Sequence, residues 1–277
     1  MTTSTFVLAV IVQSLALSAI MSGAWVVQQR TGNSGWVDAI WTFGLGLVGS
    51  LSALMPLSSS VPGRQLAVAS IVIAWSLRLG HHIASRTAGI SDDPRYAELI
   101  RGWGPDARRQ MCWLLQKQAL VTIPLAASIF LAAHNPAPGF RLQDAVAVCV
   151  MIVAIAGEAT ADRQLRAFRS VPANHGKVCD VGLWRWSRHP NYFFEWLGWI
   201  AYPVVAVDLA GGYAWGWAAL AGPVLMYWLL VHVSGIPPLE KHMVRSRGDR
   251  FRAYQARVNA FWPWPGKSSA GNREQET

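Results

Sequence analysis

Seven apolar runs, each close to the length needed to cross a lipid bilayer, dominate this sequence of 277 residues. They cover roughly Ser4–Val27, Trp36–Leu57, Leu66–Ile83, Trp113–Ala133, Leu142–Ala161, Phe193–Leu209 and Tyr213–Gly235. About 20 apolar residues in a helix span the hydrocarbon core, where the backbone must satisfy its own hydrogen bonds. Because the runs are continuous rather than alternating, they predict helices and not the strands of a barrel. We therefore predict an all-α polytopic integral membrane protein with about seven transmembrane helices.

The charged residues are concentrated outside these runs, and their distribution decides what the net charge of +9 means. Seven spans place the loops alternately on two sides, and one side carries 20 of the 24 Lys and Arg residues, whereas the other carries only Arg64 and Arg141. The positive-inside rule then predicts a plasma (inner) membrane protein with its amino terminus outside and its carboxyl terminus in the cytoplasm. Positive charge so placed favours anionic headgroups and an anionic cofactor over nucleic acid.

The domain organisation follows from the same pattern. We predict a single transmembrane helical domain over residues 1–266 and a disordered tail over residues 267–277, because the last residues are polar. Nothing in the sequence specifies an oligomeric state.

The stretch 182–195, GLWRWSRHPNYFFE, concentrates polar chemistry between two apolar runs. Arg185, Arg188 and His189 offer donors for phosphate or carboxylate oxygens, and Asn191 offers an amide that both donates and accepts. Pro190 suits the first turn of a helix. One interpretation is a basic loop that only contacts lipid headgroups. We favour a ligand site, because topology requires only Lys or Arg and has no use for the amide, phenol and carboxylate that follow.

His189 is expected to orient or bind a cofactor rather than to donate a proton. The positive charge of the adjacent Arg188 disfavours an imidazolium, which keeps the ring neutral at pH 7. A neutral ring donates one hydrogen bond and accepts another. The alternative is a structural histidine bonded to the backbone at the start of a helix.

Charged side chains also lie at the ends of the other apolar runs. Asp38 lies about one turn inside its run, where a carboxylate faces a partner or a water-filled cavity, or is stabilised by the helix dipole. The connection 92–96 either folds over a ligand or is a solvated loop with local salt bridges. The predicted topology places Asp38, Arg78, His82, Glu158, Asp162, Arg163, Glu195 and Glu240 at the cytoplasmic ends. Together they predict a polar cavity that admits a lipid substrate from the bilayer.

Two further patterns concern helix packing and ion pairs. Residues 44–49, GLGLVG, have the spacing of the dinucleotide-binding fingerprint, but they lie inside an apolar helix and therefore predict close helix packing. The helical spacing of Glu158, Asp162, Arg166 and Arg169 predicts an ion-pair ladder. Asp144 and Asp208 lie at the outer helix ends, where we expect water.

No metal site or disulfide is predicted. His81 and His82 are adjacent, whereas metal ligands on one helix need a spacing of three or four residues. Cys112, Cys149 and Cys179 form no Cys-x-x-Cys pair.

Three features resemble the steroid 5-alpha-reductase-like superfamily, which includes the membrane sterol C=C reductases. They are Gly-Leu-Trp-x-x-Ser-Arg-His-Pro-Asn-Tyr at 182–192, the helix end with Asp162, and the basic tail with Tyr254. A bacterial branch of unassigned substrate also shares Asp-x-x-Trp at 38–41, Arg-Leu-Gly at 78–80 and Pro-Leu-Glu at 238–240.

The resemblance implies a cytoplasmic half that binds NADPH without a Rossmann fold. The matching positions here are Asp162, Arg163, Arg166, Arg188, His189, Asn191, Tyr192 and Tyr254, and Lys177, Glu195 and Glu240 complete the predicted cofactor-binding set. In the steroid 5-alpha-reductases, a Gln-Glu pair in helix two and a Tyr in helix three polarise the substrate. This sequence offers Asp38, His81 and His82 instead, which argues against a 3-oxo steroid.

The resulting hypothesis is a membrane-embedded, NADPH-dependent reductase of a C=C bond in an apolar lipid that is steroid-, sterol-, isoprenoid- or fatty-acyl-like. Asp38, His82 or Tyr192 would donate the proton.

Arg-His-Pro-x-Tyr followed by Glu also resembles isoprenylcysteine and phospholipid methyltransferases, so an S-adenosylmethionine-dependent methyltransferase of a lipid or prenylated acceptor is an alternative. A lipid-binding membrane protein without enzymatic activity is another.

Overall fold

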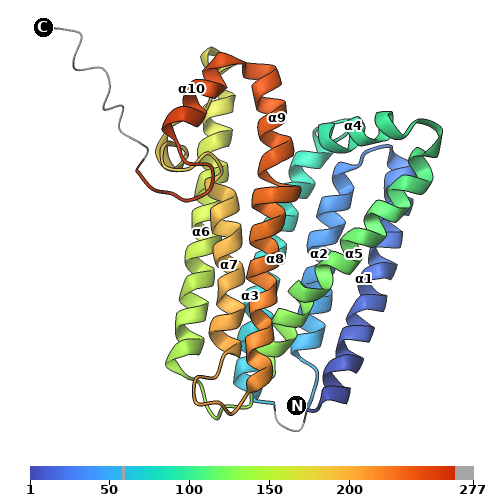
Figure 1. The fold of residues 1–277 in the computed structure, drawn as a ribbon, viewed down its shortest axis with the longest axis vertical. Coiled ribbons are helices and arrows are strands. Elements are labelled where there is room, and N and C mark those ends of the chain that lie inside the picture. Colours follow the sequence, from blue (N-terminus) through green and yellow to red (C-terminus); the bar gives the residue numbers. More distant parts are fainter. Residues whose placement is uncertain (58–59, 266–277) are drawn as a thin grey trace, which may run out of the picture. The chain divides into compact units, whose positions relative to one another are not determined.

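The computed structural model describes residues 1–57 and 60–265, and helices dominate it (Figure 1). Helical residues make up 79% of the chain. The described residues contain no β-strand, only an isolated bridge between Ser187 and Asn259. The predicted all-α class is therefore confirmed. The tail predicted over residues 267–277 lies outside the described residues.

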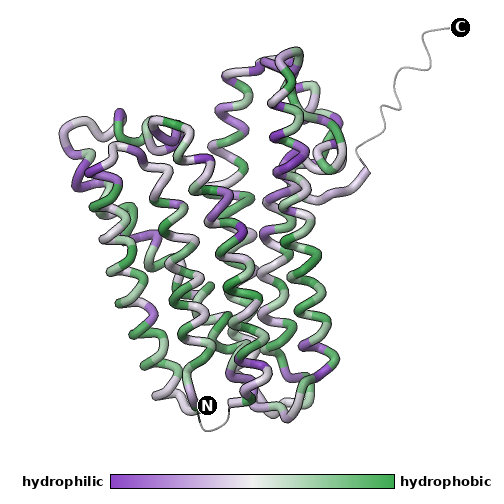
Figure 2. Tube along the Cα trace, turned by 180° about the vertical axis from the view of Figure 1, so that it is seen from behind, coloured by the Kyte–Doolittle hydropathy of each residue, from purple (hydrophilic) through white to green (hydrophobic). Residues whose placement is uncertain are grey.

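Among the described residues, six helical segments are long and apolar enough to cross a membrane. They are α1 (Thr3–Thr31), α2 (Gly35–Ala53), α3 (Pro62–Ala88), Pro94–Ala133, α6 (Leu142–Ser170) and Ala214–Arg247. Hydrophobic residues occupy the middle of these helices and hydrophilic residues gather toward their ends (Figure 2). The remaining predicted run forms α7 (Pro190–Ala206), whose 17 residues rise about 26 Å, less than the ~30 Å hydrocarbon core.

Shorter elements divide two of the long segments and connect the others. Pro94–Ala133 consists of α4 (Pro94–Trp103), the 3₁₀ turn η1 (Gly104–Asp106) and α5 (Ala107–Ala133). Ala214–Arg247 consists of the 3₁₀ segment η4 (Ala214–Leu220), α8 (Ala221–Trp228), the π-helical turn η5 (Leu229–Val233) and α9 (Ile236–Arg247). The 3₁₀ turns η2 (Pro172–Asn174) and η3 (Gly182–Arg185) follow α6, and α10 (Asp249–Arg257) follows α9.

The contacts of the chain group into two compact units. Unit 1 comprises residues 1–149 and 200–225, and unit 2 comprises residues 150–199 and those from 226 onward. Every residue of the predicted cofactor-binding set belongs to unit 2, and this includes Tyr192, which is also a predicted proton donor. Asp38 and His82 belong to unit 1.

In unit 1, α2 packs against α1, α3 and α5 (Figure 1). The three glycines at 44, 46 and 49 make these close approaches possible. A Cβ atom on Gly44 would lie 2.6 Å from a side chain of α1, and one on Gly49 would lie 2.8 Å from a side chain of α5. A Cβ atom on Gly46 would lie 2.3 Å from the Cβ of Ser76 in α3. The prediction that these glycines serve helix packing is confirmed.

Asp144 is buried, contrary to the expectation that water surrounds it. Only 2% of Asp144 is exposed, and its carboxylate lies 3.0 Å from Arg64 and 2.8 Å from Arg141. Arg64 also donates to three carbonyls of the connection 134–141. Two guanidinium groups thus replace water around this carboxylate, which makes its burial possible.

We expect Gly46→Ala to lower the free energy of unfolding by about 1–3 kcal/mol, because the added methyl group overpacks the contact between α2 and α3. The control is Gly23→Ala in α1, where an added Cβ would meet no atom within 4 Å. Thermal unfolding in detergent compares the two variants. Equal melting temperatures would show that α2 and α3 do not need this close approach.

Candidate functional site

The stretch 182–195 is anchored to the end of α6 within unit 2. Gly182 has a φ of +58°, and a Cβ at this position would lie 2.5 Å from the side chain of Gln164, so the turn requires glycine. The Gln164 side chain accepts a hydrogen bond from a backbone N–H of η3 at 2.9 Å, and the indole of Trp184 donates to a carbonyl of α6 at 3.0 Å. The chain then enters α7 at Pro190, as the sequence predicts.

Glu240 of α9 is the centre of the polar network in unit 2. Its carboxylate accepts from Nε of Arg188 at 2.7 Å and from Nη2 of Arg188 at 3.1 Å. It also lies 3.0 Å from Nε2 of His189 and accepts from the amide of Gln255 at 2.6 Å. Arg188 further donates to the carbonyls of Gln255 and Val258. The ion pair is largely shielded from solvent, since the two side chains are 11% and 13% exposed.

His189 is buried with one ring nitrogen bonded and the other without a partner. Only 3% of the residue is exposed, and its ring stacks on Tyr192 with centroids 5.5 Å apart. Burial lowers the pKa of His189, and this effect outweighs the opposing influence of Glu240. The expected neutral state thus follows mainly from burial, with a smaller contribution from Arg188. If Nε2 donates to Glu240, then Nδ1 is a buried acceptor that meets no donor among the described residues.

The other residues of the predicted cofactor-binding set differ in their exposure. Asp162, Glu195 and Tyr254 are buried, Asn191 and Tyr192 are half-buried, and Arg163, Arg166 and Lys177 are exposed. Arg163 donates to the hydroxyl of Thr160 at 3.1 Å, and Glu195 accepts from the indole of Trp199 at 2.9 Å. The ion-pair ladder along α6 remains a prediction. Unit 2 therefore combines buried acidic groups with exposed basic ones.

Tyr254 has a structural contact that its sequence position did not suggest. Its hydroxyl donates to the carbonyl of Trp184 and lies 3.4 Å from the carbonyl of Ser187. Burial raises the pKa of Tyr254, so the phenol stays protonated as a donor. Tyr254 therefore holds α10 against the 182–189 segment.

Asp38 in unit 1 pairs with the connection that precedes α5. Its carboxylate accepts from the guanidinium of Arg95 and from the hydroxyl of Tyr96 at 2.9 Å. The amide of Gln118 in turn donates to Tyr96 at 3.0 Å. Arg95 also acts on the neighbouring carboxylate of Asp93. Burial alone would raise the pKa of Asp93, but the hydrogen bonds and the positive charge of Arg95 outweigh that effect, so the pKa of Asp93 is lowered overall. Asp38 thus faces a partner, which is one of the alternatives that its position in the sequence left open.

His82 is half-buried near the end of α3. The described residues contain no group of three His, Cys, Asp or Glu side chains placed to hold a metal ion. Three glutamines of the two networks, Gln118, Gln164 and Gln255, were not predicted from the sequence. Trp184 and Ser187 lie in the predicted 182–195 stretch, but the sequence did not indicate their bonds, because no spacing signals a bond to a residue far away in the sequence.

The fold and these networks define a polytopic all-α membrane protein with a network of charged side chains in each unit. The chain belongs to the family described as "Protein of unknown function (DUF1295)", whose model matches residues 24–258. The matched region includes both networks. No curated protein and no solved structure matches the chain.

We expect Glu240→Ala to destabilise unit 2 by about 3 kcal/mol, because it leaves the buried charge of Arg188 without its carboxylate. Asp249→Ala is the control, since Asp249 is 96% exposed in its ion pair with Arg252, and we expect no measurable change there. Chemical denaturation in detergent, followed by tryptophan fluorescence, measures both. Equal stability of the two variants would rule out the central role of Glu240.

The lowered pKa of His189 predicts a pH dependence of stability. As the pH falls, His189 takes up its proton first in the unfolded chain, where its pKa is near 6.5. The neutral His189 therefore makes its full stabilising contribution to the folded state above that pH. It is lost as the pH falls through the lower pKa of the folded state. Melting temperatures from pH 8 to pH 5 should therefore fall less for His189→Gln than for the wild type. His175→Gln, at an exposed position, should follow the wild type, and identical profiles for all three proteins would contradict the assignment.

Proposed function

We propose that this protein is an NADPH-dependent reductase that acts on a C=C bond of an apolar lipid. The observation that carries the proposal is the buried Nδ1 of His189, an acceptor without a donor beside the Arg188–Glu240 pair. A buried acceptor without a partner costs free energy, which a ligand N–H or O–H would recover. NADPH offers such donors on its carboxamide and its ribose hydroxyls.

The basic residues of unit 2 support a cofactor that carries phosphates. Arg163 and Arg166 are exposed on α6, and Lys177 is exposed in the connection that follows. Guanidinium groups bind phosphate oxygens through charge-assisted hydrogen bonds. Arg188 is less suited to this role than the sequence suggests, because Glu240 and two carbonyls already occupy most of its donors.

The resemblance to the steroid 5-alpha-reductase-like superfamily supports the reaction class. When bound, NADPH supplies a hydride to one carbon of the double bond, and the other carbon takes a proton. Asp38, His82 and Tyr192 are the proposed proton sources. In the network around Asp38, both carboxylate oxygens accept hydrogen bonds, and the hydroxyl of Tyr96 carries the proton. Asp38 would therefore act together with Tyr96 rather than as an acid by itself.

The six apolar helical segments support a substrate that enters from the bilayer. The Lys and Arg bias of the loops supports a plasma membrane location with the amino terminus outside and the cofactor site on the cytoplasmic side.

The second candidate is a methyltransferase that uses S-adenosylmethionine. Buried acidic residues favour it, since Glu158, Asp162 and Glu195 suit the amino group and ribose of that ligand. The phosphates distinguish the two candidates, because NADPH carries them and S-adenosylmethionine does not.

We expect the double substitution Arg163→Gln and Arg166→Gln to weaken NADPH binding by about 100-fold or more, since each lost charge-assisted bond to phosphate contributes about 1.5–3 kcal/mol. NADPH fluorescence titration of the purified protein measures this. Arg250→Gln is the control, because Arg250 is exposed in α10 and lies outside both the predicted set and the 182–195 stretch. An unchanged NADPH affinity of the double variant would show that Arg163 and Arg166 do not bind the phosphates of NADPH. Binding of S-adenosylmethionine without NADPH would favour the methyltransferase.

A further inference from the structure

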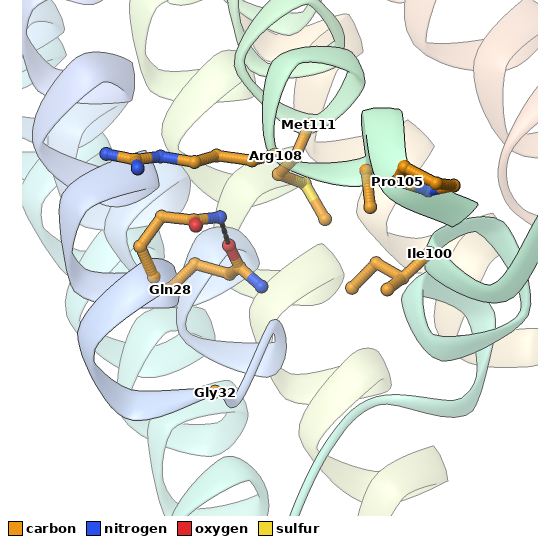
Figure 3. Close-up of a pocket in the computed structure, with 8 residues that line it drawn as sticks. Gln28, Gly32, Ile100, Pro105, Arg108 and Met111 are labelled. Carbon is orange, nitrogen blue, oxygen red and sulfur yellow. Dashed lines mark hydrogen bonds between the residues drawn. The ribbon is translucent and has the colours of Figure 1, made fainter. Parts of the chain in front are cut away.

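A cavity of about 360 Å³ lies in unit 1, apart from the predicted cofactor-binding residues (Figure 3). It lies where the end of α1 meets α4, η1 and the beginning of α5. Figure 3 shows Gln28 and Arg108 on one side and Ile100 and Pro105 facing them from the other. The cavity therefore has one polar wall and one apolar wall, and its volume is in the range of small-molecule sites.

The polar wall presents an uncompensated positive charge. Within the described parts of the chain, Arg108 forms no ion pair, whereas its neighbour Arg109 pairs with Asp106 at 3.3 Å. The guanidinium of Arg108 lies 5.2 Å from the ring centroid of Trp25, whose indole donates to the carbonyl of Arg108 at 3.1 Å. These two contacts hold Arg108 in place but leave the positive charge of its guanidinium without a negative partner.

Two amides adjoin this charge. Gln28 is buried, and its side-chain oxygen accepts from the amide of the exposed Gln29 at 2.7 Å. This bond orients Gln29 and leaves its own side-chain oxygen and second N–H for other partners. A guanidinium and an amide N–H beside each other suit a phosphate group.

The apolar wall and the position in the fold indicate where such a phosphate would come from. Ile100, Pro105 and the buried Met111 offer no hydrogen bonds, so they would contact glycerol or acyl carbons. α1 and α5 pack against each other, and both belong to segments of membrane-spanning length. The end of such a helix lies at the level of lipid headgroups, where tryptophan is common and basic pockets between helices bind anionic lipids.

We propose that this cavity binds the phosphate headgroup of an anionic phospholipid, with Arg108 and Gln29 contacting the phosphate and Met111 and Ile100 contacting the acyl end. The lipid is a bound component at this position and not the substrate of the proposed reductase. The inference does not depend on the proposed function, because it uses no residue of unit 2.

Thermal unfolding of the full-length protein in neutral detergent micelles tests the proposal. Dioleoylphosphatidylglycerol should raise the melting temperature of the wild type, and dioleoylphosphatidylcholine should raise it less. Arg108→Gln should require about tenfold more phosphatidylglycerol for the same rise, because it loses the charge-assisted contact. Arg109→Gln, one residue further along α5, removes the same charge from the exposed pair with Asp106 and should behave as the wild type.

Native mass spectrometry provides a second measurement that does not depend on melting. The wild type and Arg109→Gln should retain one phosphatidylglycerol, and Arg108→Gln should lose it. Equal effects of the two lipids, or full retention by Arg108→Gln, would overturn the proposal. If inorganic phosphate alone stabilises the wild type as much as phosphatidylglycerol does, the site binds a soluble phosphate and the lipid assignment is wrong.

Discussion

The carboxylate of Glu240 is the interaction on which the organisation of unit 2 depends. It bonds Arg188 and His189 at the start of α7 and Gln255 in α10, although these residues lie far apart in the sequence. A buried carboxylate is unfavourable unless hydrogen bonds and an opposite charge replace its water. Three partners meet that need, and in doing so they fix the position of the 182–195 stretch, which Tyr254 and Gln164 hold from two other sides.

The same network determines the chemical state of His189. Its bond to Glu240 orients the ring, and burial favours the neutral form. One nitrogen then donates and the other can only accept. A donor within the chain could have satisfied this second nitrogen, yet none of the described residues does so. This unsatisfied acceptor, together with the exposed arginines of α6, is the physical basis for proposing a ligand here.

Much of the fold could be predicted from the sequence, because membrane spans are local features. The apolar runs located all six spanning segments of the described residues and α7, and the glycines of α2 indicated close packing before any partner helix was known. Local patterns were less reliable at breaks in the helices. The run Tyr213–Gly235, predicted as one span, is divided into η4, α8 and the π-helical turn η5, and Pro237 and Pro238 then lie in the first turn of α9, where a missing N–H costs no hydrogen bond.

The candidate site was only partly predictable. The 182–195 stretch was recognisable because its polar residues are adjacent, but its partners were not. Asp38 and Arg95 lie 57 residues apart, and Arg188 and Glu240 lie 52 apart, so no helical spacing connects them. The burial of Asp144 was missed for the same reason, since its partner Arg64 is 80 residues away. Such pairs depend on tertiary packing, which composition and periodicity do not specify.

The most direct test of the central claim is native mass spectrometry of the mildly purified protein, equilibrated in turn with NADPH, NADH and S-adenosylmethionine. The proposed site predicts one NADPH per chain and no adduct with S-adenosylmethionine. It also predicts loss of the NADPH adduct in the double variant Arg163→Gln and Arg166→Gln. Retention of S-adenosylmethionine without any nicotinamide nucleotide would contradict the claim.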